Sequence, residues 1–269
     1  MPQKPPPRRA DRRGPPPRAP FPREEAEGPV WLFGIHAVRD ALVNPARVRR
    51  RLIVTRNAAD RLAAEIAASG MVAEIADARR FPAPLDPASV HQGAALEAEP
   101  LDWGGLAACA PSASEPAPVV LLLDRVTDPH NVGAVLRSAE VFGARAVIAP
   151  RRHAAPETGA LAKAASGALE RQPYLRVANL ARAMEALRGM GYALVGLDGA
   201  AEATLAEAVS VTAGRPLALA LGAEGPGLRE LTRATCDTLA RIPAARGFAS
   251  LNVSNAAAVA LYEAARRSA

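Results

Sequence analysis

The stretch PVVLLLDRVTDPHNVGAVLRSAEVFGARAVIAP, residues 118–150, decides the fold class of this 269-residue chain. It begins with an uninterrupted apolar run, which is typical of a strand buried on both faces of a sheet. A helical pattern follows, because apolar residues recur every three or four positions at Val132, Val135, Leu136 and Ala139. A second apolar run, RAVIAP, ends the stretch. A strand, a helix and a strand in this order predict a parallel strand pair joined by a helical crossover.

The alternation of strand and helix patterns continues to the end of the chain. Further strands are predicted at 173–177, 192–198, 216–222 and 238–243, and further helices at 157–170, 179–191, 227–236 and 250–267. We therefore expect an α/β fold in which residues 118–269 form a mostly parallel sheet with helices on both faces. Ligands of such sheets bind at the carboxyl ends of the strands, so polar residues that follow the strands are the first candidates for a site.

The preceding residues predict a second, smaller unit. Residues 29–100 indicate a compact α/β domain, with helices expected at 34–44 and 57–69 and strands at 50–55, 71–77 and 91–99. Residues 101–117, which end in APSASEPAP, have the composition of a linker. Residues 1–28 are rich in proline and arginine, and we expect a disordered tail there.

The charge of the chain is concentrated in this tail. Residues 1–23 contain seven basic residues and one acidic residue, whereas the rest of the chain holds 26 of each. A basic segment of this kind either keeps the chain soluble or binds RNA through salt-sensitive phosphate contacts, and the sequence leaves both open.

Composition excludes several classes of protein. A hydrophobic content of 49% is enough to fill a globular core. No apolar run approaches the roughly 18 residues that span a bilayer, and the N-terminus lacks a hydrophobic signal region, so we expect a cytoplasmic protein without a membrane partner. The two cysteines, Cys109 and Cys236, are isolated and no histidines cluster, so neither a disulfide framework nor a metal site is indicated.

The first polar group lies in TDPHNVGAVLRSA, where Arg137 interrupts a small and apolar helical pattern. Gly133, one turn earlier, leaves room for the arginine side chain to fold back or for a ligand to approach. Asp128 and Asn131 can cap the start of the helix. This stretch is equally consistent with an exposed Arg137 and with an Asn131 that only caps the helix.

The second group, LGAEGPGLREL, places Glu224 among three glycines directly after a predicted strand. Such a turn exposes backbone N–H groups, but it is neither the GxGxxG dinucleotide fingerprint nor a phosphate loop. A carboxylate in the turn would repel phosphate, so a cationic ligand fits better. Alternatively, Glu224 complements the dipole of the helix that follows.

The third group, in IPAARGFASLNVSNAAAV, crowds four polar residues at one helix start: Ser250, Asn252, Ser254 and Asn255. One cap uses one or two of them, so the remainder are candidates for a binding site.

Taken together, NVGAVLR (131–137), LGAEGPGL (221–228) and IPAARGFASLNVSNAAAVALYE (242–263) resemble the three motifs of the SpoU (TrmH-like) family of RNA ribose 2′-O-methyltransferases, part of the SPOUT superfamily. GIHAV (34–38) and HQG (91–93) are similar to the ends of that family's ribosomal-protein-like RNA-binding domain. The runs around 123–148 and KAASGALE (163–170) look most like the bacterial 23S rRNA guanosine 2′-O-methyltransferases.

The resemblance implies a C-terminal trefoil knot that binds S-adenosylmethionine, and a homodimer packed through the knotted region, with the motif-one arginine near the partner's cofactor. It implies cofactor contacts, mainly by backbone groups, at Gly196, Gly222, Ile242 and Leu251. It implies a catalytic group of Arg137, Asn131, Glu224, Ser250 and Asn252, in which Arg137 acts on the target hydroxyl. A guanidinium is a poor base at neutral pH, so we expect it to stabilise the developing alkoxide and to hold the adjacent phosphate.

Weaker candidates for RNA contacts are His36, His91, Lys163 and Ser166. Because the chain has few aromatic residues, we expect recognition of RNA shape, phosphates and 2′-hydroxyls rather than base stacking. Two other functions stay open: methylation of a tRNA by an enzyme of the same family, and a catalytically inactive RNA-binding protein of ribosome assembly. A nicotinamide-dependent dehydrogenase is disfavoured because the glycine fingerprint is missing.

Overall fold

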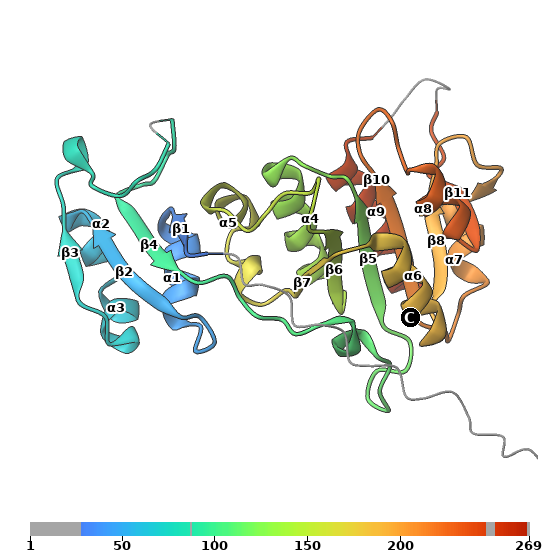
Figure 1. Ribbon diagram of the computed structural model, residues 1–269, viewed down its shortest axis with the longest axis horizontal. Helices are drawn as coiled ribbons and strands as arrows, with labels where there is room; N and C mark the ends of the chain where they lie inside the picture. Colours follow the sequence, from blue (N-terminus) through green and yellow to red (C-terminus); the bar gives the residue numbers. More distant parts are fainter. Residues whose placement is uncertain (1–27, 87, 246–250, 268–269) are drawn as a thin grey trace, which may run out of the picture.

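The computed structural model describes residues 28–86, 88–245 and 251–267. These residues form two sheets that lie side by side, with α5 between them (Figure 1). The tail predicted for residues 1–28 lies outside the described residues except for Gly28.

The larger sheet has seven strands in the order β7-β6-β5-β10-β8-β11-β9, and all neighbouring strands are parallel. The strands are β5 Val119–Asp124, β6 Ala146–Pro150, β7 Tyr174–Val177, β8 Ala193–Leu197, β9 Ala203–Thr204, β10 Leu217–Gly222 and β11 Thr238–Arg241. The helices of this part are α4 Pro129–Val141, α5 Gly159–Ala165, α6 Leu180–Gly189, α7 Leu205–Ser210, α8 Glu230–Thr235 and α9 Val253–Arg266. The predicted α/β class and its parallel sheet are confirmed.

The smaller sheet has the order β1-β4-β2-β3, from β1 Val30–Phe33, β4 Ala94–Ala98, β2 Arg49–Val54 and β3 Ala73–Ile75. Its helices are α1 Ile35–Val43, α2 Arg56–Arg61 and α3 Ala63–Ser69. β4 is antiparallel to both of its neighbours, whereas β2 and β3 run parallel. The carboxyl ends of β1, β2 and β3 and the start of β4 therefore lie at the same edge of this sheet.

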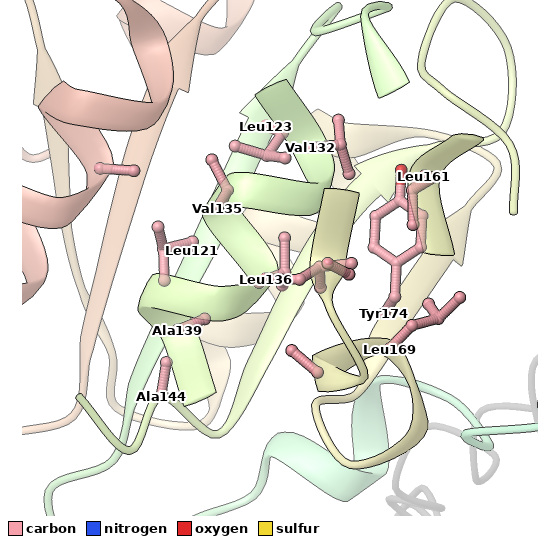
Figure 2. Packing of buried hydrophobic residues seen from close by; sticks show 14 of the residues in the cluster. Leu121, Leu123, Val132, Val135, Leu136, Ala139, Ala144, Leu161, Leu169 and Tyr174 are labelled. Atoms are coloured by element: carbon pink, nitrogen blue, oxygen red, sulfur yellow. The ribbon is translucent and has the colours of Figure 1, made fainter. Parts of the chain in front are cut away.

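Helix α4 packs its apolar face on β5, as the 131–143 pattern predicts. Val132, Val135, Leu136 and Ala139 are all fully buried, and Figure 2 shows them between Leu121 and Leu123 of β5 and the side chains of Leu161, Leu169 and Tyr174. This contact fixes the direction in which the rest of α4 presents its polar residues.

Gly133 serves the packing of α5, and the expectation that it makes room for Arg137 or a ligand is wrong. A Cβ atom at Gly133 would lie 2.5 Å from the Cβ of Ala164 and 2.8 Å from the backbone N of Ala165. Two helices can approach this closely only where one of them lacks a side chain. Gly159, in α5, has the same role toward the smaller sheet, where its Cβ would lie 2.3 Å from the carbonyl oxygen of Trp31.

A buried ion cluster also joins the two parts. Arg47 donates to Glu170 through Nε at 3.0 Å and through Nη2 at 2.5 Å, and to Glu157 through Nη1 at 2.5 Å. Asn44 adds a bond to Glu170 at 2.8 Å. Glu157 has one guanidinium contact and a second carboxylate nearby, and burial raises its pKa above the ordinary value. The single guanidinium of Arg47 is thus the counter-ion of two buried carboxylates, Glu157 and Glu170.

Some elements differ from the sequence-based prediction. Strand β1 was not predicted, because VWLF is too short to show an alternating pattern, and β9 and α7 were also missed. The helix predicted over 57–69 is divided at Leu62 into α2 and α3. The helix predicted over 157–170 ends at Ala165, because Ser166 and Gly167 both have positive φ (50° and 91°). A short 3-10 helix, Ala168–Glu170, follows.

The segment between the two sheets packs against the larger one. Leu106 and Cys109 are buried in the core beside α6, and the Tyr192 hydroxyl donates to the Cys109 carbonyl at 2.6 Å. Of the helices in the described ranges, none is long and apolar enough to cross a membrane.

Candidate active site at the carboxyl edge of the large sheet

The three polar groups meet where the parallel strands end. Asn252 donates through Nδ2 to Oε1 of Glu224 at 2.7 Å and to Oδ1 of Asn131 at 2.9 Å. Asn131 donates through its own Nδ2 to Oε1 of Glu224 at 3.3 Å. These residues lie up to 121 positions apart in the sequence, and the strand ends of a parallel sheet bring them together.

Asn131 reaches this cluster because Asp128, rather than Asn131, caps α4. The Asp128 carboxylate accepts from the backbone N–H groups of His130 at 3.0 Å and Asn131 at 3.4 Å. Asn131 lies inside the first turn of the helix, so its side chain is available to Glu224. The capping role that the sequence allowed for Asn131 is therefore wrong.

Glu224 is presented by a tight loop after β10. Gly227 donates to the Ala223 carbonyl at 2.9 Å, and Gly225 and Gly227 adopt φ values of +84° and +69°, which strain other residues. The carboxylate then accepts from the backbone N–H of Val253, the first residue of α9, at 3.3 Å. Its negative charge therefore faces the positive end of α9, not of α8 as the sequence suggested.

Asn252 caps α9 and also binds the cluster. Its Oδ1 accepts from the backbone N–H of Ser254 at 2.9 Å and from the Ser254 hydroxyl at 2.6 Å. This leaves its Nδ2 free to bind Glu224 and Asn131. Ser250 lies outside the described residues, so its predicted catalytic role remains a prediction.

Arg137 is not part of this cluster within one chain. It follows Asn131 by six residues, which on a helix means about 9 Å along the axis and about 120° around it. The side chain is exposed and makes no hydrogen bond or ion pair with residues of the described ranges. It lines an open depression of about 300 Å³ together with Ala134, Ser138, Val141 and Phe142.

Three of the predicted cofactor residues lie on the adjacent strands β10, β8 and β11 or just beyond them, and Leu251 lies before α9. Gly196 in β8 has no room for a side chain, since a Cβ would lie 2.7 Å from the Cys236 sulfur. Gly222, at the end of β10, is covered by the backbone of Gly227, to which a Cβ would lie 2.0 Å away. Ile242 is half-buried, and Leu251 is exposed beside the residues that are not described.

This arrangement fits a nucleoside bearing a positive sulfur. Leu197, Leu228 and Ile242 provide half-buried apolar side chains around the ends of β8, β10 and β11, which suit an adenine ring. The Glu224 carboxylate is exposed at the same edge and suits a cation. No group of three or more metal-binding side chains occurs among the described residues.

The candidate RNA-binding residues gather where the smaller sheet meets α5. Lys163 donates through Nζ to the Val90 carbonyl at 2.9 Å, so its ammonium group fixes the loop before β4. In that loop, His91 stacks on Phe81 with ring centroids 4.2 Å apart. His36 is exposed on α1, and Ser166 ends α5 in a left-handed conformation.

Sequence analysis missed a group of basic residues at the same carboxyl edge. Arg152, His153 and Arg229 line a cavity of about 210 Å³. Arg229 donates from Nε to Oδ1 of Asp124 at 2.6 Å and from its backbone N–H to Oδ2 at 2.9 Å, and Asp124 is fully buried at the end of β5. The signal was the run RRH, which directly follows a buried strand.

Comparison with known proteins agrees with this geometry. A profile of the SpoU rRNA Methylase family matches residues 118–262. The 23S rRNA (guanosine-2′-O-)-methyltransferase RlmB of Ralstonia nicotianae is 40% identical over 242 residues, which is 88% of this chain and 95% of that protein. The protein of the same name from a Burkholderia species is 52% identical over 153 residues, which is 57% of this chain and 61% of that relative.

Among solved structures, the SpoU methyltransferase AviRb from Streptomyces viridochromogenes, in complex with the cofactor AdoMet, superposes with a TM-score of 0.74 at 27% identity, covering 89% of this chain and 90% of that one. The resemblance inferred from the three motifs is thereby confirmed. Since the family profile covers more than half of the chain, and a 40% identical relative is matched over nearly its full length, this chain belongs to the SpoU rRNA Methylase family.

Proposed function

We propose that this protein transfers the methyl group of S-adenosylmethionine to the ribose 2′-hydroxyl of a guanosine in 23S rRNA. The observation that carries the proposal is the convergence of Asn131, Glu224 and Asn252, one from each family motif, in a single hydrogen-bonded cluster. The target is supported by the relatives, which are named as 23S rRNA guanosine 2′-O-methyltransferases. We also propose a cytoplasmic location, since an enzyme with this substrate acts where ribosomes are assembled.

When bound, S-adenosylmethionine supplies a methyl group on a positively charged sulfur. The loops after β8, β10 and β11, with Gly196, Gly222, Ile242 and Leu251, would hold the cofactor. Alignment of the attacking oxygen with the methyl carbon and sulfur is the main task of such a site, and good alignment contributes up to about 7–11 kcal/mol to a reaction of this kind. Asn131, Glu224 and Asn252 fix one another's positions, and we assign them, with Ser250, to shaping the site around the ribose.

Arg137 would stabilise the oxygen anion that develops on the ribose and hold the neighbouring phosphate. Its guanidinium stays protonated at neutral pH, so it acts as a charge and a donor rather than as a base. Because Arg137 is exposed and makes no contact with the cluster of its own chain, we assign it to the site of a second copy in a homodimer.

An apolar surface on α4 and α9 supports this dimer. Val141 is 76% exposed and Tyr262 is 54% exposed, and the Tyr262 ring packs edge-on against Phe142 with centroids 6.1 Å apart. Val259 is also exposed on α9. Large apolar side chains grouped in this way mark contact surfaces. A two-fold axis here would pair like residues and carry each Arg137 toward the other chain.

The remaining assignments follow from family membership. We propose that the last part of the chain forms a trefoil knot, a topology that is nearly absent elsewhere. Support comes from the path of the chain, which runs from β11 near one edge back to α9, packed on α4 and β10. We also propose residues 29–100 as the RNA-binding domain and 118–269 as the methyltransferase domain, joined by 101–117. His36, His91, Lys163 and Ser166 lie on the RNA side.

The decisive experiment maps ribose methylation across total RNA in a deletion strain, in the parent and in a complemented strain. We expect one guanosine of 23S rRNA to lose its methyl group in the deletion strain and to regain it on complementation. Loss of a tRNA methyl group instead would contradict the ribosomal target. An unchanged map, together with no heat of S-adenosylmethionine binding in calorimetry, would identify an inactive RNA-binding protein.

A further inference from the structure

The cavity lined by Arg152, His153 and Arg229 is not used by the proposed methyl transfer. It lies between the turn after β6, the start of α6 and the start of α8, with a volume of about 210 Å³. Both strands that reach it, β6 and β7, end there, so the cavity opens on the same edge of the sheet as the candidate active site.

All acidic or basic residues that line this cavity are basic ones. Arg152 and His153 are exposed, and neither makes a hydrogen bond or an ion pair with any residue in the ranges that the structure describes. By contrast, the exposed Arg188 is paired with Asp237 at 2.9 Å. Two adjacent unpaired basic side chains on one cavity wall are instead available to an anion.

Arg229 forms the opposite wall and is fixed in place. Its backbone N–H and Nε use both oxygens of the buried Asp124 carboxylate, which leaves the two terminal nitrogens of the guanidinium for another acceptor. A carboxylate that holds one side of a guanidinium orients the other side. The start of α6 adds the positive end of a helix dipole to these side chains.

The cavity is also close to the proposed point of reaction. Glu224 and Arg229 belong to one loop and are five residues apart, so they are separated by at most about 18 Å. An RNA strand spans this distance in a few nucleotides. A phosphate bound beside Arg229 would therefore belong to a residue near the methylated one.

We propose that this cavity binds a backbone phosphate of the substrate RNA, a few nucleotides from the target ribose, through Arg152, His153 and Arg229. Guanidinium groups bind phosphate oxygens in paired hydrogen bonds, and such contacts position an RNA without reading its sequence. This inference rests on the proposed function, because it takes RNA as the substrate.

The test compares Arg152→Glu with Arg215→Glu in the full chain. Arg215 precedes β10 at the opposite edge of the sheet, is exposed, and has no side-chain partner among the described residues, so the two variants change charge equally. Affinity for unmodified, transcribed 23S rRNA is measured over a series of salt concentrations. Calorimetry with S-adenosylmethionine checks the fold and the cofactor site of each variant.

We expect Arg152→Glu to weaken RNA binding about tenfold at low salt and to reduce the slope of log affinity against log salt by about 0.7 to 0.9, the amount for one phosphate contact. Arg152→Lys should retain most of the affinity, because a lysine still pairs with a phosphate as a point charge. Cofactor affinity should stay at the wild-type value in all variants.

Equal RNA affinities and salt slopes for Arg152→Glu and Arg215→Glu would overturn the inference. Methyl transfer by the wild-type protein is followed on the same RNA. If the wild type methylates the RNA and the two variants bind alike, only the phosphate site is wrong. If the wild type transfers no methyl group, the proposed function fails, and the difference between the two variants still decides whether this cavity binds RNA.

Discussion

Charged side chains occur both at the interface between the two sheets and near the carboxyl edge of the larger sheet. They are buried and paired at the interface, but several of those near the edge are exposed and, within the described ranges, unpaired. At the interface, Arg47 is fully buried and bonds two carboxylates and a backbone carbonyl. At the edge Arg152 is exposed, as is Arg137 farther along α4, and neither has a partner among the described residues. The first arrangement fixes the architecture, whereas the second leaves cations available to a ligand.

Removing the interface cation should have the largest effect. Arg47→Ala leaves Glu157 and Glu170 buried without their counter-ion, and we expect the free energy of unfolding to fall by about 3–5 kcal/mol. Urea denaturation followed by circular dichroism measures it. Arg50→Ala, which breaks an exposed pair with Glu99, is the control and should cost at most about 1 kcal/mol.

If Arg47→Ala does not fold, a second variant can still test whether charge stabilises this interface. Replacing Arg47 by Met together with Glu157→Gln and Glu170→Gln removes the charges as a set, and it should recover much of the lost stability. A triple variant that is as unstable as Arg47→Ala would mean that packing, rather than charge, dominates this interface.

Removing the exposed cation of α4, Arg137, should instead leave the fold intact. We expect Arg137→Ala to lower methyl transfer about 10²- to 10³-fold, with unchanged unfolding and cofactor affinity, because it removes contacts to the developing anion and the neighbouring phosphate but none in the core. Mixing Arg137→Ala with Glu224→Ala should restore activity to about one quarter of the wild-type sites if each site combines two chains. The absence of any recovery in mixed dimers would place Arg137 and Glu224 in the same chain's site.

A smaller effect is expected at the contact of α4 with α5. Gly133→Ala forces a methyl group into the backbone of α5 and should destabilise the protein by about 1–3 kcal/mol in thermal unfolding. The matched control is Gly189→Ala at the end of α6, where a Cβ meets nothing within 4 Å. There an alanine should be neutral or stabilise by up to about 1 kcal/mol. Equal effects of the two substitutions would contradict the close approach of the helices.

The smallest effect is a dependence on pH. Burial raises the pKa of Glu157 above its ordinary value of 4.5, so the protonated form favours the folded state, and this contribution is lost as the pH rises through the raised pKa. We therefore expect the unfolding free energy of the wild type, relative to Glu157→Gln, to decrease with pH from 4.5 upward. Urea titrations at a series of pH values measure it, and an increase would reverse the assigned direction.

The sequence was informative where function depends on local patterns. The alternation after Pro118 predicted the parallel sheet, and the polar groups after its strands predicted that Asn131, Glu224 and Asn252 belong together. The sheet and the polar strand ends follow from periodicity and from the rule that parallel strands end at one edge, whereas the grouping of the three residues came from the resemblance to the family motifs.

The sequence could not reveal roles that depend on contacts between distant segments. Gly133 was assigned to Arg137 because both lie on one helix, whereas its actual neighbour is Ala164 of α5. One alternative for Glu224 was the dipole of the helix that follows it, but the carboxylate accepts from the first backbone N–H of α9. The two carboxylate partners of Arg47 lie more than 100 residues away, so no local pattern could show that it is buried.

Helix α5 has glycine contacts on both sides, with Gly133 against one face and its own Gly159 against β1, and Lys163 fastens it to the loop before β4. The hydrophobic core runs through α5 without interruption from one sheet to the other. This close packing leaves no room for the two sheets to rotate relative to each other about α5. If an RNA binds to both parts of the molecule, the distance between the two binding surfaces is therefore fixed. The protein would then select substrates in which the segment bound by the smaller part lies at a matching distance from the target nucleotide.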